Sequence, residues 1–140
     1  MSRWTIDASV AVKWFVPEVH SEAAASWLGA DFELLAPDLL YPEVGNILWK
    51  KFRRSELSAR EMQIVRKAID RVPFQLSSGR KLLGAAIDLA MGLDRSVYDC
   101  MYLAVAMAFD APLVTADRKL FEAIGATCFA GHVRWLEDKP

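Results

Sequence analysis

The chain has 140 residues, of which 54% are hydrophobic and 25% charged, and its formal net charge is −1. This length fits a single domain spanning 1–140, and the composition supplies enough apolar material for a core, which excludes a globally disordered chain. A net charge near zero excludes nucleic-acid binding by overall charge, so any such surface must be a local patch.

The predicted elements alternate between short β-like runs and longer helical patterns. In chain order we expect a strand at 4–6, helices at 9–15 and 21–29, a strand at 32–36, helices at 38–56 and 59–72, a weak strand at 74–76, helices at 79–92 and 97–109, a strand and turn at 112–117, a helix at 118–125 and a last strand at 126–130. Ser21 is a candidate N-cap, and either Asp38 caps the long third helix or Pro42 marks its first turn. Ser58 and Glu61 have the spacing of a capping box.

This alternation of strands and helices predicts an α/β fold with a central, mainly parallel sheet and helices on both faces. In such sheets, ligands bind beyond the carboxyl ends of the strands. Side chains that follow a strand directly, or that begin the helix after it, are therefore the candidates for a functional site.

Cysteine spacing and hydropathy favour a cytoplasmic protein without a membrane partner. Cys100 and Cys128 lie in apolar stretches that lack any CxxC or Cys/His spacing, so we expect two reduced core residues. The N-terminus has no long apolar segment typical of a signal peptide. The longest apolar run, at 101–109, is nine residues and too short to cross a bilayer.

Four acids occupy comparable places in the predicted sheet. Asp7 and Asp117 follow predicted strands directly, and Glu43 and Asp99 lie in the first turns of predicted helices. Taken singly, each is best interpreted as a helix cap or an ordinary first-turn acid. Taken together, they come from four segments that converge on the carboxyl edge of a parallel sheet.

Converging carboxylates repel one another, and a divalent cation removes this conflict. Mg²⁺ and Mn²⁺ prefer oxygen ligands and often bind through a few carboxylates. Such an ion orients a phosphodiester and stabilises its developing charge, so the pattern indicates metal-assisted phosphodiester hydrolysis. Asp38 and Asp94 lie near the expected site, as helix caps or as peripheral ligands.

Four segments of the chain, taken together, resemble the PIN domain, and specifically the VapC-type toxins of bacterial and archaeal toxin–antitoxin pairs. They are "TIDASVAVKWFVPE" (5–18), "APDLLYPEVGNILWK" (36–50), "SVYDCMYLAVA" (96–106) and "PLVTADRKL" (112–120).

The resemblance implies a three-layer α/β/α sandwich with a five-stranded parallel sheet and an endoribonuclease activity that depends on Mg²⁺ or Mn²⁺. It implies one or two metal ions and a metal-activated water that attacks the scissile phosphate of RNA. No histidine is needed as a base, and we expect His20 and His132 at the surface. The acidic quartet of the family, which is catalytic and binds the metal, maps onto Asp7, Glu43, Asp99 and Asp117.

Three further residues are expected to support the quartet. Thr115 matches a Ser/Thr position of the family, and its hydroxyl is expected to bond either a metal-bound water or Asp117. Asn46, one turn after Glu43, either orients that glutamate, touches substrate or is a buried, satisfied amide. Ser9 offers a hydroxyl to cap the first helix, which leaves Asp7 free for a metal.

Basic side chains are concentrated in 50–71, which holds eight of the seventeen Lys and Arg residues against three acids. This segment is either a phosphate-binding patch or a solvated helical hairpin. Arg118 and Lys119 follow a predicted metal ligand directly. The candidate substrate-binding residues are Arg118, Lys119, Lys50, Lys51, Arg53 and Arg54.

Five tryptophans are many for a chain of this size, and core packing is the default expectation for each. Apolar residues beyond the needs of one small core would suit a dimer interface or a groove for an apolar partner helix. The resemblance implies a homodimer that a cognate VapB-like antitoxin holds inactive. Two alternatives to a toxin remain open. One is a PIN-like DNA or RNA-processing nuclease, and the other is a non-catalytic RNA- or protein-binding module, against which the intact quartet argues.

Overall fold

The computed structural model describes residues 2–140, and its centre is a five-stranded sheet in the order β3-β2-β1-β4-β5. All four strand pairings are parallel, as the sequence predicted. The strands are β1 (Ser2–Ile6), β2 (Phe32–Pro37), β3 (Gln75–Ser77), β4 (Leu113–Thr115) and β5 (Val133–Trp135).

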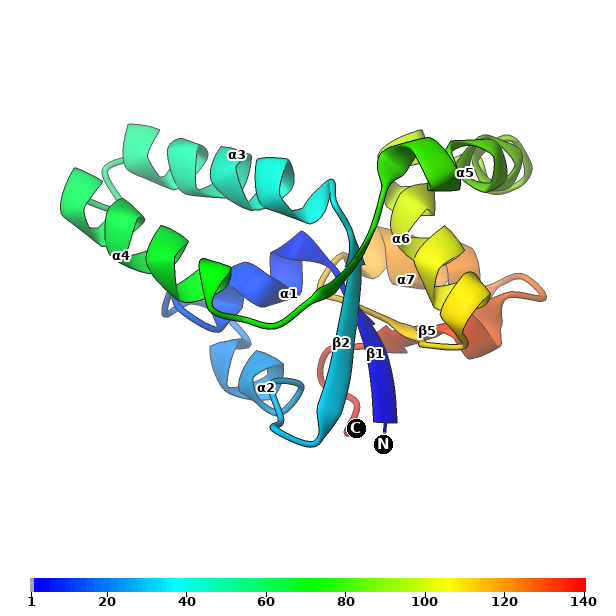
Figure 1. Cartoon of the computed structure of the whole chain (residues 1–140), viewed down its shortest axis with the longest axis horizontal. Coiled ribbons are helices and arrows are strands. Elements are labelled where there is room, and N and C mark those ends of the chain that lie inside the picture. Colours follow the sequence, from blue (N-terminus) through cyan, green and yellow to red (C-terminus); the bar gives the residue numbers. More distant parts are fainter. Residues whose placement is uncertain (1) are drawn as a thin grey trace.

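The helices form two layers that enclose this sheet, which confirms the three-layer α/β/α arrangement. One face carries α1 (Ala8–Lys13), α2 (Ser21–Ala25), α3 (Leu40–Arg53) and α4 (Ala59–Asp70), and the other carries α5 (Gly79–Leu93), α6 (Val97–Phe109) and α7 (Arg118–Gly125) (Figure 1). In Figure 1, α3 and α4 project from the sheet as an antiparallel pair.

The core lies where the central strands meet both layers. All three residues of β4 are buried, and so is Ile6 at the end of β1. Parallel strands buried on both faces are expected to be apolar throughout, yet Thr5 and Thr115 are fully buried in this core. Thr5 donates to the carbonyl of Ala111 at 2.8 Å, so its hydroxyl is satisfied locally. Thr115 instead faces the carboxyl edge, where its hydroxyl serves the site described below.

Side-chain caps define several helix starts. The predicted capping box is present: the Ser58 hydroxyl accepts the Glu61 N–H, and the Glu61 carboxylate accepts the Ser58 N–H. Ser21, in contrast, is the first helical residue of α2 and not its N-cap, because its hydroxyl accepts the Glu18 N–H. The helix α3 begins at Leu40 with Leu39 as its N-cap residue, so Asp38 does not cap it, and Pro42 lies in its first turn, as the second alternative predicted.

The predicted last strand at 126–130 is wrong. The Thr127 hydroxyl donates to the Ile124 carbonyl at 2.7 Å and accepts the Phe129 N–H at 3.1 Å, so the chain turns where an extended strand was expected. A 3-10 turn at Ala130–His132 follows, and β5 begins only at Val133. Local side-chain bonding therefore outweighs the apolar character of this segment.

Exposure corrects one of the two cysteine predictions. Cys100 is buried as expected, but Cys128 is exposed, because it lies in the turn that replaces the predicted strand. His20 is exposed and His132 is half-buried. Within 2–140, no helix is long and apolar enough to cross a membrane.

Candidate active site

Asp7 lies at the junction of β1 and α1, at the carboxyl edge of the sheet. Its backbone carbonyl begins the helix by accepting the Val10 and Ala11 N–H groups, but its side chain makes no cap. Its Oδ2 atom instead accepts hydrogen bonds from the hydroxyls of Thr115 at 2.8 Å and Ser9 at 3.1 Å. The cap interpretation of the Asp7 side chain is therefore wrong.

Ser9 also differs from its predicted role. Its hydroxyl donates to Asp7 and accepts the Ala116 N–H at 3.3 Å, so it ties α1 to the segment after β4 and does not cap α1. Thr115 makes a parallel link, because its hydroxyl donates to Asp7 and accepts the Asp117 N–H at 3.0 Å. Thr115 thus positions Asp7 directly and Asp117 through its backbone.

Asp7 is half-buried. Burial raises the pKa of Asp7 to about 6, and the nearby charges of Glu43 and Asp99 add to this rise. The hydroxyls of Thr115 and Ser9 act in the opposite direction by stabilising the ionised form. The raising causes prevail, so the ionised form of Asp7 is less favourable here than in water.

Glu43 lies in the first turn of α3, and its Oε1 accepts the Tyr102 hydroxyl at 2.6 Å. Burial raises the pKa of Glu43, and the charge of Asp99 adds to the rise. Burial, together with the charges of Asp7 and Glu43, raises the pKa of Tyr102 far above its usual range. Tyr102 therefore stays protonated and acts as a permanent donor to Glu43.

Asp99 lies in the first turn of α6, where the Ser96 hydroxyl caps the helix by accepting the Asp99 N–H. Its Oδ2 accepts a hydrogen bond from Nη2 of Arg95 at 3.1 Å, and the same Arg95 nitrogen lies 3.6 Å from Oδ2 of Asp117. The other Asp117 oxygen, Oδ1, accepts the Leu120 N–H at 3.2 Å and caps α7. Asp117 therefore serves as a helix cap. Its side chain is 43% exposed, against 29% for the side chain of Asp99.

The four acids are thus connected at one edge of the sheet. Asp7, Glu43 and Asp99 influence one another through their charges, and Arg95 joins Asp99 to Asp117. Across the described residues, no three Asp, Glu, His or Cys side chains are gathered closely enough to surround an ion. Carboxylate oxygens are the ligands that hard divalent cations prefer, so the quartet suits such an ion in its chemistry.

Two contributors to the site, Tyr102 and Arg95, were not identified from the sequence. Tyr102 lies three residues after Asp99 on α6, and Arg95 lies four residues before Asp99. The three-residue spacing from Asp99 places Tyr102 on the same side of α6, and this spacing could have indicated Tyr102 from the sequence. Of the two other nearby acids, Asp38 accepts the Gly79 N–H at 3.1 Å, and Asp94 ends α5 in a left-handed conformation.

The residues expected to touch substrate lie in different environments. Asn46 is exposed, which excludes the buried-amide alternative, and it lines a depression with Glu43, Lys50 and Tyr98. Lys50, Arg53 and Arg54 line a second depression with Trp49, over whose ring the Arg53 guanidinium lies at 4.9 Å.

The remaining predicted basic residues differ in how freely they face solvent. Lys51 is only 16% exposed and forms an ion pair with Glu18. The Arg118 guanidinium lies 4.1 Å from the Trp135 ring centroid, at the end of β5, and Lys119 is exposed.

Comparison with known proteins gives a consistent result. The family model of the PIN domain matches residues 5–126. The chain is 33% identical to ribonuclease VapC3 of Pyrobaculum aerophilum over 86% of its own length and 94% of the relative. It is 34% identical to ribonuclease VapC1 of Mycobacterium tuberculosis over 96% of its own length and 100% of the relative.

A solved structure from Pyrobaculum aerophilum has the same fold, with a TM-score of 0.71, 23% identity, and coverage of 97% of this chain and 90% of the other. The segments matched by the family model include all four acids of the quartet. The chain therefore belongs to the PIN domain family, with VapC ribonucleases as its relatives.

Proposed function

We propose that this protein is the toxin of a VapBC-type pair, an endoribonuclease that needs Mg²⁺ or Mn²⁺ and hydrolyses RNA phosphodiester bonds in the cytoplasm. The observation that carries the proposal is Asp7, a half-buried acid whose pKa is raised to about 6 and which the charges of Glu43 and Asp99 reach. Buried structural acids are normally paired with a cation, whereas the hydrogen-bond partners of the Asp7 side chain within residues 2–140 are two hydroxyls.

The divalent ion would be held by carboxylate oxygens of the quartet, and it supplies charge stabilisation at the phosphate and a water of lowered pKa. The chain's own residues prepare this site. Thr115 and Ser9 fix the orientation of Asp7, and Tyr102 does the same for Glu43. Because Asp7 and Glu43 each keep one oxygen outside these hydrogen bonds, both remain able to coordinate.

The RNA path that we propose runs along the exposed side of α3, beside Glu43. Lys50 lines both depressions on this surface, so it joins the quartet to the Trp49 and Arg53 pair. Lysine and arginine bind phosphates without regard to sequence, and an exposed tryptophan offers a face on which a base stacks. Lys51 is left out of this path because Glu18 neutralises it.

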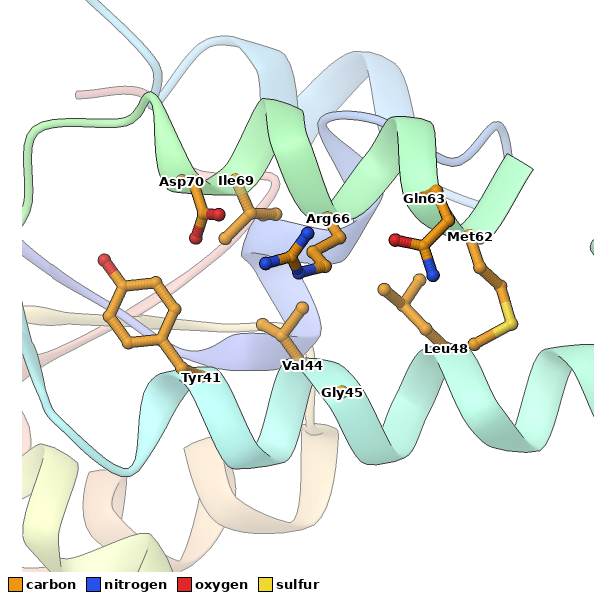
Figure 2. A pocket seen from close by; sticks show the side chains of 9 residues that line it. All are labelled: Tyr41, Val44, Gly45, Leu48, Met62, Gln63, Arg66, Ile69 and Asp70. Carbon is orange, nitrogen blue, oxygen red and sulfur yellow. The ribbon is translucent and has the colours of Figure 1, made fainter. Parts of the chain in front are cut away.

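For the antitoxin, we propose a docking groove between α3 and α4. Figure 2 shows the side chains of the two helices pointing toward one another, around a space of about 280 Å³. Its walls are mainly apolar, with Val44 and Leu48 from α3 and Met62 and Ile69 from α4. Arg66 and Asp70 provide charges beside this apolar lining (Figure 2). An amphipathic segment of a VapB-like partner is the ligand that such a groove suits.

A homodimer is the assembly that we propose, formed through the outer side of α5. Leu83, Ile87 and Met91 recur every four residues and are 46%, 40% and 80% exposed. This spacing aligns them on one side of the helix, and a contiguous apolar stripe of this kind is typical of a contact surface. Light scattering of the wild type and of Ile87→Glu tests the assignment, since the charge should release monomers.

The function itself is tested by expression in cells, with wild type compared with Asp7→Asn and with mapping of cleaved RNA ends. Growth arrest with new RNA ends in the wild type alone supports a toxin nuclease. Cleavage in vitro without growth arrest would favour an RNA-processing or DNA nuclease. Salt-sensitive RNA binding without turnover in any metal would favour a non-catalytic module.

A further inference from the structure

A depression of about 410 Å³ opens beside Glu43, between the two helices α3 and α6. From α3 it is lined by Glu43, Asn46 and Lys50, and from α6 by Tyr98. These helices belong to opposite layers of the fold (Figure 1), and the first turn of each lies at the carboxyl edge of the sheet. The depression therefore adjoins the acidic quartet from the side where a substrate strand would pass.

One hydrogen bond fixes how the two helices face each other. The Tyr102 hydroxyl of α6 donates to Oε1 of Glu43 on α3 at 2.6 Å. Tyr98 precedes Tyr102 by four residues, and Asn46 follows Glu43 by three. Each therefore lies one helical turn from this bond, on the same side of its helix. A ligand that enters the depression meets walls that are already in place.

The lining combines an aromatic ring, an amide and apolar side chains. Tyr98 is 61% exposed. A single exposed aromatic residue is ordinary on a protein surface, but this one lines a depression beside a candidate catalytic acid. Pro42 and Ile47 supply apolar contacts, and the exposed Asn46 amide offers two donors and an acceptor. A flat ring with polar groups on its edge is the ligand that such a lining suits.

We propose that this depression is a nucleobase subsite, which takes one unpaired base of the RNA strand, stacked on Tyr98 and hydrogen-bonded at its edge by Asn46. This inference rests on the ribonuclease function proposed above and adds the residues that select the RNA sequence near the cut. Sequence-specific proteins recognise RNA mostly in single strands, where a splayed-out base stacks on an aromatic side chain and exposes its edge. The Lys50 charge in the same depression suits the phosphate next to that base.

The chemistry of the Asn46 amide favours adenine as the bound base. Its oxygen accepts from the N6 amino group while its NH₂ group donates to N7, which is the usual match between asparagine and adenine. Guanine presents two acceptors on this edge, O6 and N7, and the amide oxygen opposes one of them. A pyrimidine has a smaller ring, so it gains less from stacking on Tyr98.

Binding of labelled oligonucleotides to the full-length protein in EDTA tests the subsite without cleavage. Short single-stranded oligo(A), oligo(U) and oligo(C) are compared by fluorescence anisotropy, and wild type should bind oligo(A) most tightly. Tyr98→Ala should weaken this binding about tenfold, whereas Tyr98→Phe keeps the ring and should leave it nearly unchanged. Asn46→Ala should reduce the preference for oligo(A) over oligo(C) by about fivefold or more.

Two matched controls remove similar groups far from the depression. Phe109→Ala removes an exposed aromatic ring at the other end of α6, and Gln75→Ala removes an exposed amide at the start of β3. Both should bind the three oligonucleotides as wild type does. Circular dichroism checks the fold of each variant. If Tyr98→Ala does not fold, Tyr98→Leu removes the aromatic face while keeping most of the volume, and the same expectation applies to it.

The sequences at the cuts made in one long RNA in Mn²⁺ give a second readout. Wild type should cut beside adenine, and Asn46→Ala should spread the cuts over all four bases. If Asn46 only orients Glu43, cleavage falls equally at every site and the affinities in EDTA do not change, which would overturn the inference.

The remaining outcomes separate the subsite from the proposed nuclease. Equal affinity of wild type for the three oligonucleotides, no binding of any of them, or unchanged binding by Tyr98→Ala would overturn the subsite, while RNA cleavage by wild type would leave the nuclease intact. A wild type that prefers oligo(A) but cleaves no RNA in any metal would contradict the nuclease and support the subsite.

Discussion

Asp7 should limit the stability of the metal-free protein, and Asp7→Asn should therefore stabilise it while abolishing RNA cleavage. The pKa of Asp7 is raised from 3.8 to about 6, chiefly by burial. At 1.36 kcal/mol per pKa unit, holding Asp7 ionised well above pH 6 costs about 3 kcal/mol. Asparagine keeps the shape and still accepts from Thr115, but its amide needs new partners, so we expect a net gain of roughly 1–3 kcal/mol.

The sign of the pH dependence follows from the direction of this shift. Because the folded pKa lies above the unfolded one, stability from protonated Asp7 is fully present below about pH 4 and is lost as the pH rises through about 6. The gain in Asp7→Asn over wild type should therefore be largest at about pH 7.5 and small at about pH 4. In a domain of this size it corresponds to a rise in Tm of roughly 4–10 °C.

Thermal denaturation in EDTA at a series of pH values measures this difference. Asp31→Asn removes an exposed acid beside the amino end of β2 and serves as the matched control, with an unchanged Tm. Added Mn²⁺ should raise the Tm of wild type and leave that of Asp7→Asn nearly unchanged. A variant that is less stable than wild type in EDTA at about pH 7.5, or a difference that does not vary with pH, would refute the reasoning.

Three further predictions concern Thr115, Tyr102 and the capping box of α4. Thr115→Val should lower the free energy of unfolding, measured by chemical denaturation, by about 1–3 kcal/mol, because Asp7 and the Asp117 N–H both lose a hydrogen-bond partner. Thr115→Ser keeps the hydroxyl and should recover most of this loss. Tyr102→Phe should lower the free energy of unfolding by about 1 kcal/mol. It should reduce RNA cleavage by less than Glu43→Gln does, because it removes only the hydrogen bond that orients Glu43. An equal loss of cleavage in the two variants would argue against a positioning role for Tyr102. Ser58→Ala should cost about 1 kcal/mol by removing the capping box and leave the cleavage rate per folded molecule unchanged.

The sheet and the acids at its edge could be predicted because both follow from local patterns and one general rule. Alternating strand and helix signals specify parallel crossovers, and parallel strands send the residues after them to a common edge. Asp7 and Asp117 occupy such positions directly, and Glu43 and Asp99 do so through the first turns of α3 and α6. The structure confirms the sheet, and it connects the four side chains without gathering them around an ion.

The features that could not be predicted from the sequence depend on contacts between distant residues or on local hydrogen bonds that compete with regular structure. The Tyr102 bond to Glu43 spans 59 positions, so helical spacing from Asp99 could place Tyr102 near the site but could not identify Glu43 as its partner. The placement of Arg95 depends on the left-handed turn at Asp94, which helical periodicity does not specify. The apolar segment at 126–130 forms a turn stabilised by the Thr127 hydroxyl and not the predicted strand. Cys128 lies in this turn and is exposed, so the prediction of its burial was wrong for the same reason.

The central claim, a metal-dependent ribonuclease built on the acidic quartet, is tested most directly by cleavage of RNA with purified protein. Wild type, Asp99→Asn and the control Asp31→Asn are compared in Mn²⁺, in Mg²⁺ and in EDTA, with RNA ends resolved on a sequencing gel. We predict discrete internal cuts by wild type and Asp31→Asn with metal, and none in EDTA or with a folded Asp99→Asn. Cleavage that persists in EDTA or in folded Asp99→Asn would contradict the account.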